Sequence, residues 1–214
     1  MTQTVWIARH GNRIDFVNPN WFVTAERRYD PPLSEDGTIQ AQQLGQRLKS
    51  EKIVHIFASP FLRTVQTANQ VAEALDLPIK VEAGLSEWLN PEWMTVAPEK
   101  LTLAELHQQF PRIDLNYTSR MIAQYPENGT QALQRSGKTA KLLADEFPTD
   151  ILLVGHGQSV LGAVMGLSDV TVEPNIHVAL CSLFKMVRHQ KKWVMELNGD
   201  TSHLSQTEQV TRFN

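Results

Sequence analysis

Short runs of apolar and β-branched residues alternate along the chain with longer segments whose apolar positions follow helical spacing. Six short runs predict β-strands at 4–8, 53–57, 78–83, 150–154, 178–187 and 193–197. The run at 150–154 is almost wholly apolar, which is typical of a strand that helices cover on both faces. The basic segment 188–192 predicts the turn between the last two strands.

Apolar side chains three and four residues apart predict helices in most of the segments between these strands. Ser34 is a suitable N-cap for the first helix, in which Ala41, Leu44 and Leu48 share one face. Pro60 stands near the first position of the second helix, where a proline loses no hydrogen bond. Further helices are expected over 102–110, 129–147 and 157–166. The alternation of strands and helices predicts a three-layer α/β/α fold with a mostly parallel sheet.

The chain has 214 residues, which is enough for one α/β domain with a substantial core, so we expect a single domain over 1–214. Two segments interrupt the alternation. Residues 12–32 form an irregular insertion with three prolines and several aromatic residues, and a loop of this length is often functional. Residues 88–128 form a variable segment in which only one short helix is expected.

The composition is that of an ordinary globular protein, with 42% hydrophobic and 20% charged residues. A net charge of −3 gives no general attraction to nucleic acid or to anionic membranes, so a phosphate ligand has to be held by a local group of cations. No apolar run is long enough to span a membrane, and residues 4–8 predict a strand rather than part of a signal peptide. These features favour a cytoplasmic protein.

Cys181 is the only cysteine, so no disulfide can form within the chain. It stands in the apolar run 178–184, where a small buried thiol is expected. Nothing around it in the sequence resembles an activating base, so we assign it no catalytic role.

Four motifs that carry polar chemistry fall directly after predicted strands. They are Arg-His-Gly at 9–11, Ser-Pro-Phe-Leu-Arg at 59–63, Gly-Leu-Ser-Glu-Trp at 84–88 and Gly-His-Gly at 155–157. Ligands of open α/β sheets bind at the carboxyl ends of the strands, so these motifs are expected to face one site. Glycines stand beside both histidines and are expected to let the backbone approach a ligand closely.

The residue types in these motifs are suited to phosphoryl transfer. The guanidinium groups of Arg9 and Arg63 are permanently charged forks that match phosphate oxygens. His10 is a competent nucleophile at neutral pH when its reactive nitrogen is unprotonated. Glu87 could protonate a leaving oxygen. No histidines, cysteines or carboxylates stand at metal-ligand spacing, so we expect neither a metal nor another cofactor.

Each motif is weak support when taken alone. His10 could be a metal ligand or a hydrogen-bonded strand end, Arg63 a surface cation and Glu87 a solvated loop residue. Their placement after four successive strands favours one shared site. Of the other histidines, His177 is an open case because it precedes a strand near the same rim. The rest are expected in structural or solvent-exposed positions, and they include His55, His107 and His189.

At these residues the chain resembles the histidine phosphatase superfamily, also called the phosphoglycerate mutase-like family, over almost its whole length. The opening motif of that family is matched at 9–11 and its late motif at 155–157. Its second motif is matched by Ser-Pro-Phe-Leu-Arg-Thr-Val-Gln-Thr-Ala at 59–68. Its helix-entry pattern is matched by Leu-Ser-Glu-Asp-Gly at 33–37, with Gln40 and Ala41 after it.

The resemblance implies a phosphoglycerate mutase-like fold and a phosphatase in which His10 becomes phosphorylated. It further implies that Arg9, Arg63 and His156 hold the phosphoryl oxygens and that Glu87 is the proton donor. Arg13 matches an additional pocket arginine in the branch that resembles the Sts-type phosphatases and insect ecdysteroid-phosphate phosphatase. The segment Tyr-Asp-Pro-Pro-Leu at 29–33 and the long tryptophan-containing insertion also resemble that branch.

The chain departs from the cofactor-dependent mutases of the family. Those enzymes follow the Arg-His-Gly motif with Glu-Ser, whereas this chain has Asn-Arg-Ile-Asp at 12–15, and the segment 88–99 is aromatic rather than basic. Hydrolysis of a phosphorylated small molecule or another phosphoester is therefore expected. A phosphoglycerate mutase and a non-catalytic phosphate-binding protein are the alternatives, and a homodimer is left open. Aromatic residues on the bordering loops favour a partly apolar opening, and they are Trp21, Phe22, Trp88 and Trp93.

Overall fold

The computed structural model describes residues 2–168, 176–190 and 192–205. Within these ranges six strands form one sheet in the order β3-β2-β4-β1-β5-β6. The strands are β1 (Gln3–Arg9), β2 (His55–Ala58), β3 (Ile79–Val81), β4 (Ile151–Gly155), β5 (Leu183–His189) and β6 (Lys192–Asp200). The pairings among β1 to β4 are parallel, whereas β5 and β6 form an antiparallel edge. The mostly parallel sheet is therefore confirmed.

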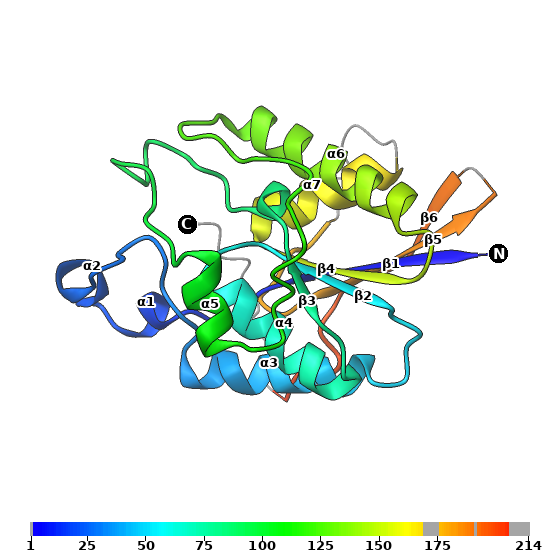
Figure 1. Cartoon of the computed structure of the whole chain (residues 1–214), viewed down its shortest axis with the longest axis horizontal. Helices are drawn as coiled ribbons and strands as arrows, with labels where there is room; N and C mark the ends of the chain where they lie inside the picture. The colour runs from blue at the N-terminus through cyan, green and yellow to red at the C-terminus, as the bar shows by residue number, and fades with distance from the viewer. Residues whose placement is uncertain (1, 169–175, 191, 206–214) are drawn as a thin grey trace.

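Two pairs of helices cover the two faces of the sheet (Figure 1). One pair is α3 (Glu35–Leu48) and α4 (Leu62–Leu75), and the other is α6 (Gly129–Glu146) and α7 (Gly157–Ser168). Side chains of β1 alternate between these layers, because Trp6 and Ala8 belong to the core on the α3–α4 side and Val5 and Ile7 to the core on the α6–α7 side. This burial on both faces explains the continuous apolar runs, and it confirms the three-layer α/β/α architecture.

Four shorter helical elements of the described chain lie between the main strands and helices. They are α1 (Ile14–Val17), α2 (Trp21–Thr24), the 3-10 helix η1 (Ala83–Leu85) and α5 (Leu103–Gln109). The insertion at 12–32 is therefore less irregular than predicted, since it contains two single helical turns. The helix expected at 102–110 is confirmed, and Thr102 caps it through a capping box.

Two predicted boundaries are wrong. Pro60 lies ahead of α4, because Phe61 is still extended and the helix begins at Leu62. The strand expected from 178 begins at Leu183, because Cys181 adopts a left-handed conformation with φ 53° that no strand accommodates. The N–H of Cys181 instead donates to the carbonyl of His10 at 3.1 Å. The turn expected at 188–192 is shorter than predicted, and Lys191 lies outside the described residues.

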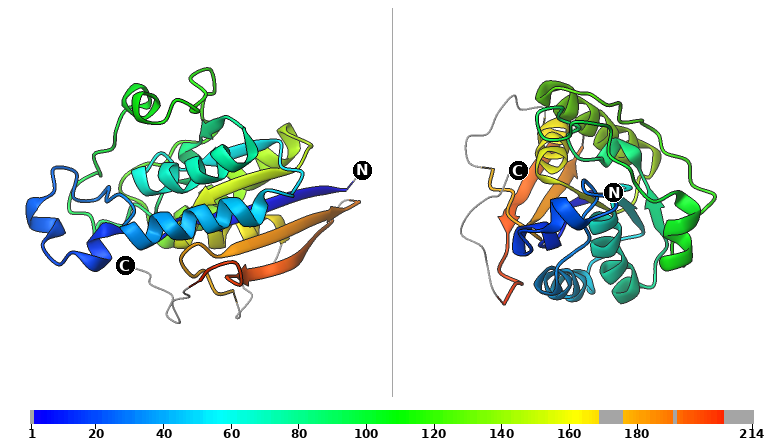
Figure 2. Two further views of the ribbon diagram at one scale, coloured as in Figure 1. Left: turned by 90° about the horizontal axis from the view of Figure 1, so that it is seen from below. Right: turned by 90° about the vertical axis from the view of Figure 1, so that its left-hand side faces the viewer.

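The parallel strands all end at one edge of the sheet. Helices α1 and α2 project beyond this edge (Figures 1 and 2). The long insertion therefore overhangs the strand ends at which the four motifs stand. Among the described residues, no helix combines the length and the apolar character needed to cross a membrane.

Candidate active site

The strand ends bring the predicted site residues together. His10 follows β1 and His156 follows β4, and their ring centroids are 5.3 Å apart. Glu87 lies just after η1, with a carboxylate oxygen 3.2 Å from Arg63 Nη2 and 3.3 Å from His156 Nδ1. Arg63 is the second residue of α4, as its predicted place in the first helical turn required. Side chains from all four sequence motifs therefore lie close together at the strand ends.

Hydrogen bonding of the His10 ring engages one nitrogen and leaves the other available as a nucleophile. Its side chain is fully buried, and Nδ1 lies 2.7 Å from the carbonyl oxygen of Gly11. Because a carbonyl only accepts, we assign the ring proton to Nδ1, which leaves Nε2 with a free lone pair. Nε2 has no hydrogen-bond partner among the described residues. Burial and then the charges of Arg63 and Arg9 hold the pKa of His10 well below its usual value. The imidazole is therefore neutral at pH 7.

His156 is fixed from both sides of its ring. Nε2 lies 2.8 Å from Ser59 Oγ, and Nδ1 faces the Glu87 carboxylate. Burial lowers the pKa of His156 to about 4, and the charge of Arg63 acts in the same direction while Glu87 opposes it. The sequence motif contained Ser59 but suggested no role for it. Its place immediately after β2 is the signal that could have identified it.

Arg63 lies between two carboxylates in the interior. Nη2 is 3.2 Å from Glu87 and Nη1 is 3.8 Å from Asp30. Burial and then the nearby charge of Arg13 lower the pKa of Arg63 to about 10, so the guanidinium keeps its charge at neutral pH. Asp30 was not predicted as a site residue. Its Oδ1 accepts the N–H of Leu62 at 2.8 Å, so it satisfies the first turn of α4 from the insertion.

Two further arginines complete a positive cluster around His10. Arg9 Nη1 donates to the carbonyl of Val178 at 2.8 Å. Arg13 is buried and forms a two-point pair with Asp15, in which Nε donates to Oδ1 at 2.9 Å. Both charges help to lower the pKa of His10, after burial and Arg63. The six predicted residues of the site therefore form one group around the strand ends.

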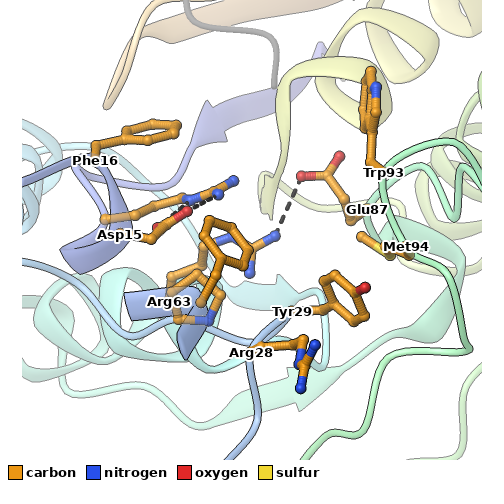
Figure 3. A pocket seen from close by; sticks show the side chains of 11 residues that line it. Asp15, Phe16, Arg28, Tyr29, Arg63, Glu87, Trp93 and Met94 are labelled. Carbon is orange, nitrogen blue, oxygen red and sulfur yellow. Dashed lines mark hydrogen bonds and ion pairs between the residues drawn. The ribbon is translucent and has the colours of Figure 1, made fainter. Parts of the chain in front are cut away.

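Two cavities open onto this group. The larger has a volume of about 290 Å³ and the smaller about 150 Å³, and both are lined by Arg13, Glu87 and Trp93. His10 lines neither, because it is fully buried beneath them. We call the apolar wall of the larger cavity the mouth (Figure 3). It consists of Phe16, Phe22, Tyr29, Trp93 and Met94.

The partly apolar opening expected from the sequence is confirmed for most of the named aromatics. Phe22 and Trp93 line the larger cavity, and Trp88 lines the smaller one. Trp21 lines neither, and its indole N–H donates to the carbonyl of Arg28 at 2.9 Å. His177 is exposed and lines neither cavity.

The structure agrees with the predictions for His189 and His55 but not with the prediction for His107. His189 is half-exposed at the end of β5, as a position near a turn implies. His55 packs edge-on against Phe147 with 4.8 Å between ring centroids. The exposure expected for His107 is wrong, because this residue is half-buried and its Nδ1 lies 3.0 Å from the carbonyl of Ile113.

Gly11 and Gly155, which stand beside the two histidines, pack closely against other parts of the chain. A Cβ at Gly11 would lie 2.5 Å from the carbonyl oxygen of Gly37, and a Cβ at Gly155 would lie 2.6 Å from Ser159 Oγ. These glycines therefore allow the chain to pack closely against itself, and their role in the approach of a ligand stays a prediction. Gly37 lies in the first turn of α3 and packs closely against Gly11. This contact explains why the Leu-Ser-Glu-Asp-Gly pattern at 33–37 ends in glycine.

One possible metal-ligand group occurs in the described part of the chain. Ligand atoms of His10, Glu87 and His156 lie within 4.8 Å of one another. Spacing along the sequence does not reveal this group, because its residues follow three separate strands. Several guanidinium groups surround the cluster and disfavour a cation there.

The family model described as the histidine phosphatase superfamily (branch 1) matches residues 5–201. The chain is 29% identical to the mouse ubiquitin-associated and SH3 domain-containing protein A over 73% of its length, and it spans 31% of that relative. It is 31% identical to the probable phosphoglycerate mutase GpmB of Yersinia enterocolitica, with 94% of both chains covered. The crystal structure of the Bombyx mori ecdysone phosphate phosphatase in complex with tungstate matches with a TM-score of 0.79, 23% identity, and coverage of 99% of this chain and 98% of that one.

Proposed function

Because the chain belongs to the histidine phosphatase superfamily, we propose that it hydrolyses phosphomonoesters through a phosphohistidine formed on His10. The observation that carries this proposal is the neutral imidazole of His10, whose Nε2 has no partner in the described part of the chain and lies among arginine side chains. A nucleophile inside a group of fixed cations is suited to a transition state that spreads negative charge over phosphoryl oxygens. Arg9, Arg13, Arg63 and His156 are the proposed ligands of those oxygens.

In the first half of the reaction, His10 Nε2 attacks phosphorus in line with the leaving oxygen. The phosphorus–oxygen bond breaks, and the leaving oxygen takes a proton from Glu87. Burial raises the pKa of Glu87, but His156 and Arg63 hold it well below its usual value before substrate arrives. A phosphate ester adds negative charge beside this carboxylate, which raises its pKa and favours the protonated form that the step requires.

In the second half, water attacks the phosphohistidine and inorganic phosphate leaves. Glu87 has given up its proton by then, so its carboxylate can accept one from the attacking water. The contact of Glu87 with both His156 and Arg63 keeps the carboxylate beside the reacting group in both halves.

The substrate class that we propose is a phosphorylated small molecule or another phosphoester whose leaving group is apolar. The larger cavity supports this choice, because the mouth brings five apolar or aromatic side chains to the edge of the arginine cluster. Catalysis without a metal is also proposed, since the guanidinium groups already supply the positive charge that a cation would bring.

The test is hydrolysis of an aryl phosphate by the purified protein. We expect release of phosphate, retention of activity after exhaustive treatment with EDTA, and acid-labile, alkali-stable phosphate on the protein after brief exposure to substrate. Absence of turnover would contradict the proposed function. Loss of activity with EDTA and its recovery with a divalent ion would instead place a metal on His10, Glu87 and His156.

A mutase is the second candidate, and one observation favours it. The Yersinia relative that matches along nearly its whole length is described as a probable phosphoglycerate mutase. A mutase returns the phosphoryl group to a sugar acid, and its substrate is small and strongly anionic. The apolar mouth fits such a substrate poorly. Product analysis with 3-phosphoglycerate and a bisphosphate primer separates the two, because a mutase gives an isomer and a phosphatase gives phosphate.

A further inference from the structure

The loop that carries Glu87 is held by a buried arginine on α6. Arg135 Nη1 donates to the carbonyls of Gly84 at 2.8 Å and Ser86 at 3.1 Å, and Nη2 donates to the carbonyl of Glu87 at 3.1 Å. Its other bonds go to the Glu127 carboxylate, from Nε to Oε2 at 3.0 Å and from Nη2 to Oε1. A guanidinium has five N–H donors, so these five bonds engage all of them.

Glu127 holds the other side of the same loop. Its Oε1 accepts the N–H of Leu89 at 3.1 Å, and its backbone N–H donates to the carbonyl of Leu89 at 3.1 Å. Its own carbonyl accepts the indole N–H of Trp88 at 2.9 Å. Residues 84–89 are therefore bound to one ion pair both before and after Glu87.

This ion pair does not belong to the phosphate-binding group. The Glu87 carboxylate faces Arg63 and His156, whereas Arg135 contacts only the backbone carbonyl of Glu87. Neither Arg135 nor Glu127 lines the two cavities. Both side chains are more than nine-tenths buried. Burying an ion pair is a weak means of stabilising a fold, so a network that converges on one loop favours a role in geometry.

We propose that Arg135 and Glu127 are positioning residues that hold the Glu87 carboxyl at the leaving oxygen, and so serve proton donation rather than phosphate binding. This inference rests on the proposed function. As the bond from His10 Nε2 to phosphorus forms, the leaving oxygen departs with its electron pair and the Glu87 proton. The more basic the departing oxygen, the more the rate depends on where that proton stands.

The test compares two substrates of similar size in the Arg135→Lys variant. Benzyl phosphate releases a basic alkoxide and needs the proton, whereas 2,4-dinitrophenyl phosphate releases a stable anion and does not. Lysine keeps the charge but offers one point of donation in place of a five-donor fork. We expect kcat/KM for benzyl phosphate, which reports the reaction up to departure of the leaving group, to fall about 10–100-fold, which is part of the full general-acid contribution. For 2,4-dinitrophenyl phosphate we expect kcat/KM to fall less than about threefold.

Three further variants calibrate this comparison. Arg112→Lys makes the same change in a surface pair with Asp76, which stands at the far end of α4 from Arg63, and should leave both substrates unaffected. Glu87→Gln removes the acid itself, so its loss of activity is the upper limit for a variant that only misplaces Glu87. Glu127→Gln keeps the shape of the side chain and weakens the same pair, so it provides the measurement if Arg135→Lys does not fold.

The outcomes distinguish the inference from the proposed function. Equal losses of kcat/KM for the two substrates, or no loss for either, in a folded variant would overturn the positioning role. If the wild-type protein hydrolyses neither ester and forms no phosphohistidine, the proposed function itself fails. A selective loss for benzyl phosphate, with phosphohistidine still forming from 2,4-dinitrophenyl phosphate, supports the inference.

Discussion

The floor of the candidate site and its mouth are built in different ways. The floor, which we define as Arg9, His10, Arg63 and His156, lies on strand ends and the first turn of a helix, and each side chain is at most 3% exposed. The mouth stands on the loops at 12–32 and 88–98, where Phe22 is 49% and Trp93 is 38% exposed. Rigid elements thus position the reacting groups, whereas loops shape the part that meets the rest of the substrate.

This difference predicts that substitutions in the floor act on the chemical step and that substitutions in the mouth act on substrate choice. The two effects separate in steady-state kinetics. Loss of an interaction made only in the transition state lowers kcat, and loss of an interaction made equally with bound substrate raises KM.

The largest effect is expected from removal of the nucleophile. His10→Ala should lose activity on every phosphomonoester by roughly 10⁴-fold or more, because it removes the group that is proposed to take up the phosphoryl group. The fold should persist, since β1 and its neighbours keep their backbone pairing. Circular dichroism and phosphate release measure the two properties. Substantial activity in a correctly folded variant would contradict the mechanism.

A smaller loss is expected when Arg63 becomes lysine. A guanidinium grips two phosphoryl oxygens at once, whereas an ammonium group supplies a single compact charge. We expect kcat of Arg63→Lys to fall by about 10²–10³-fold, as for loss of one transition-state donor, with inhibition by vanadate weakened in parallel.

A matched control for this variant is Arg47→Lys, which makes the same change in a half-exposed pair with Glu51 near the end of α3. It should retain full activity. If Arg63→Lys kept both its kcat and its vanadate inhibition, Arg63 would lie outside the reacting group.

The floor could be predicted from the sequence because each of its residues stands within a few positions of a strand end. Arg9 is the last residue of β1, and His10 and His156 directly follow β1 and β4; the parallel arrangement brings such positions to one edge. The partners that orient them could not be predicted in this way. Ser59 and Asp30 act through side-chain contacts that depend on the direction of each side chain, which the periodicity of the sequence does not show.

Partners that stand far from Glu87 in the sequence were even harder to predict. Arg135 stands 48 residues from Glu87 in the sequence, within a helix whose pattern shows only an amphipathic face. A charged residue at a buried helical position is a signal that could have found it, since such residues are seldom buried without a partner. His10, Glu87 and His156 were expected in one site, but spacing along the sequence did not mark them as possible metal ligands, because they come close only in space.

The smallest effect is expected in the mouth, with the variant Trp93→Ala. If the exposed part of this ring covers an apolar leaving group, removal of the ring leaves roughly 50 Å² of apolar surface exposed to water. The free energy of substrate binding is then weaker by about 1–1.5 kcal/mol. We therefore expect KM for 1-naphthyl phosphate to rise by about tenfold, with kcat unchanged because the floor is intact. Glycerol 2-phosphate does not reach the ring, so its KM should change by less than about twofold.

The control for the mouth is Val23→Ala on α2, next to Phe22. Val23 is 87% exposed and lines neither cavity, so its truncation should affect neither substrate. Phe22→Ala should resemble Trp93→Ala, because both rings line the same cavity. Equal changes in KM for the naphthyl and glycerol esters would mean that the mouth does not contact the leaving group. A fall in kcat alone would mean that the loops reach the chemical step, and the separation between floor and mouth would then be wrong.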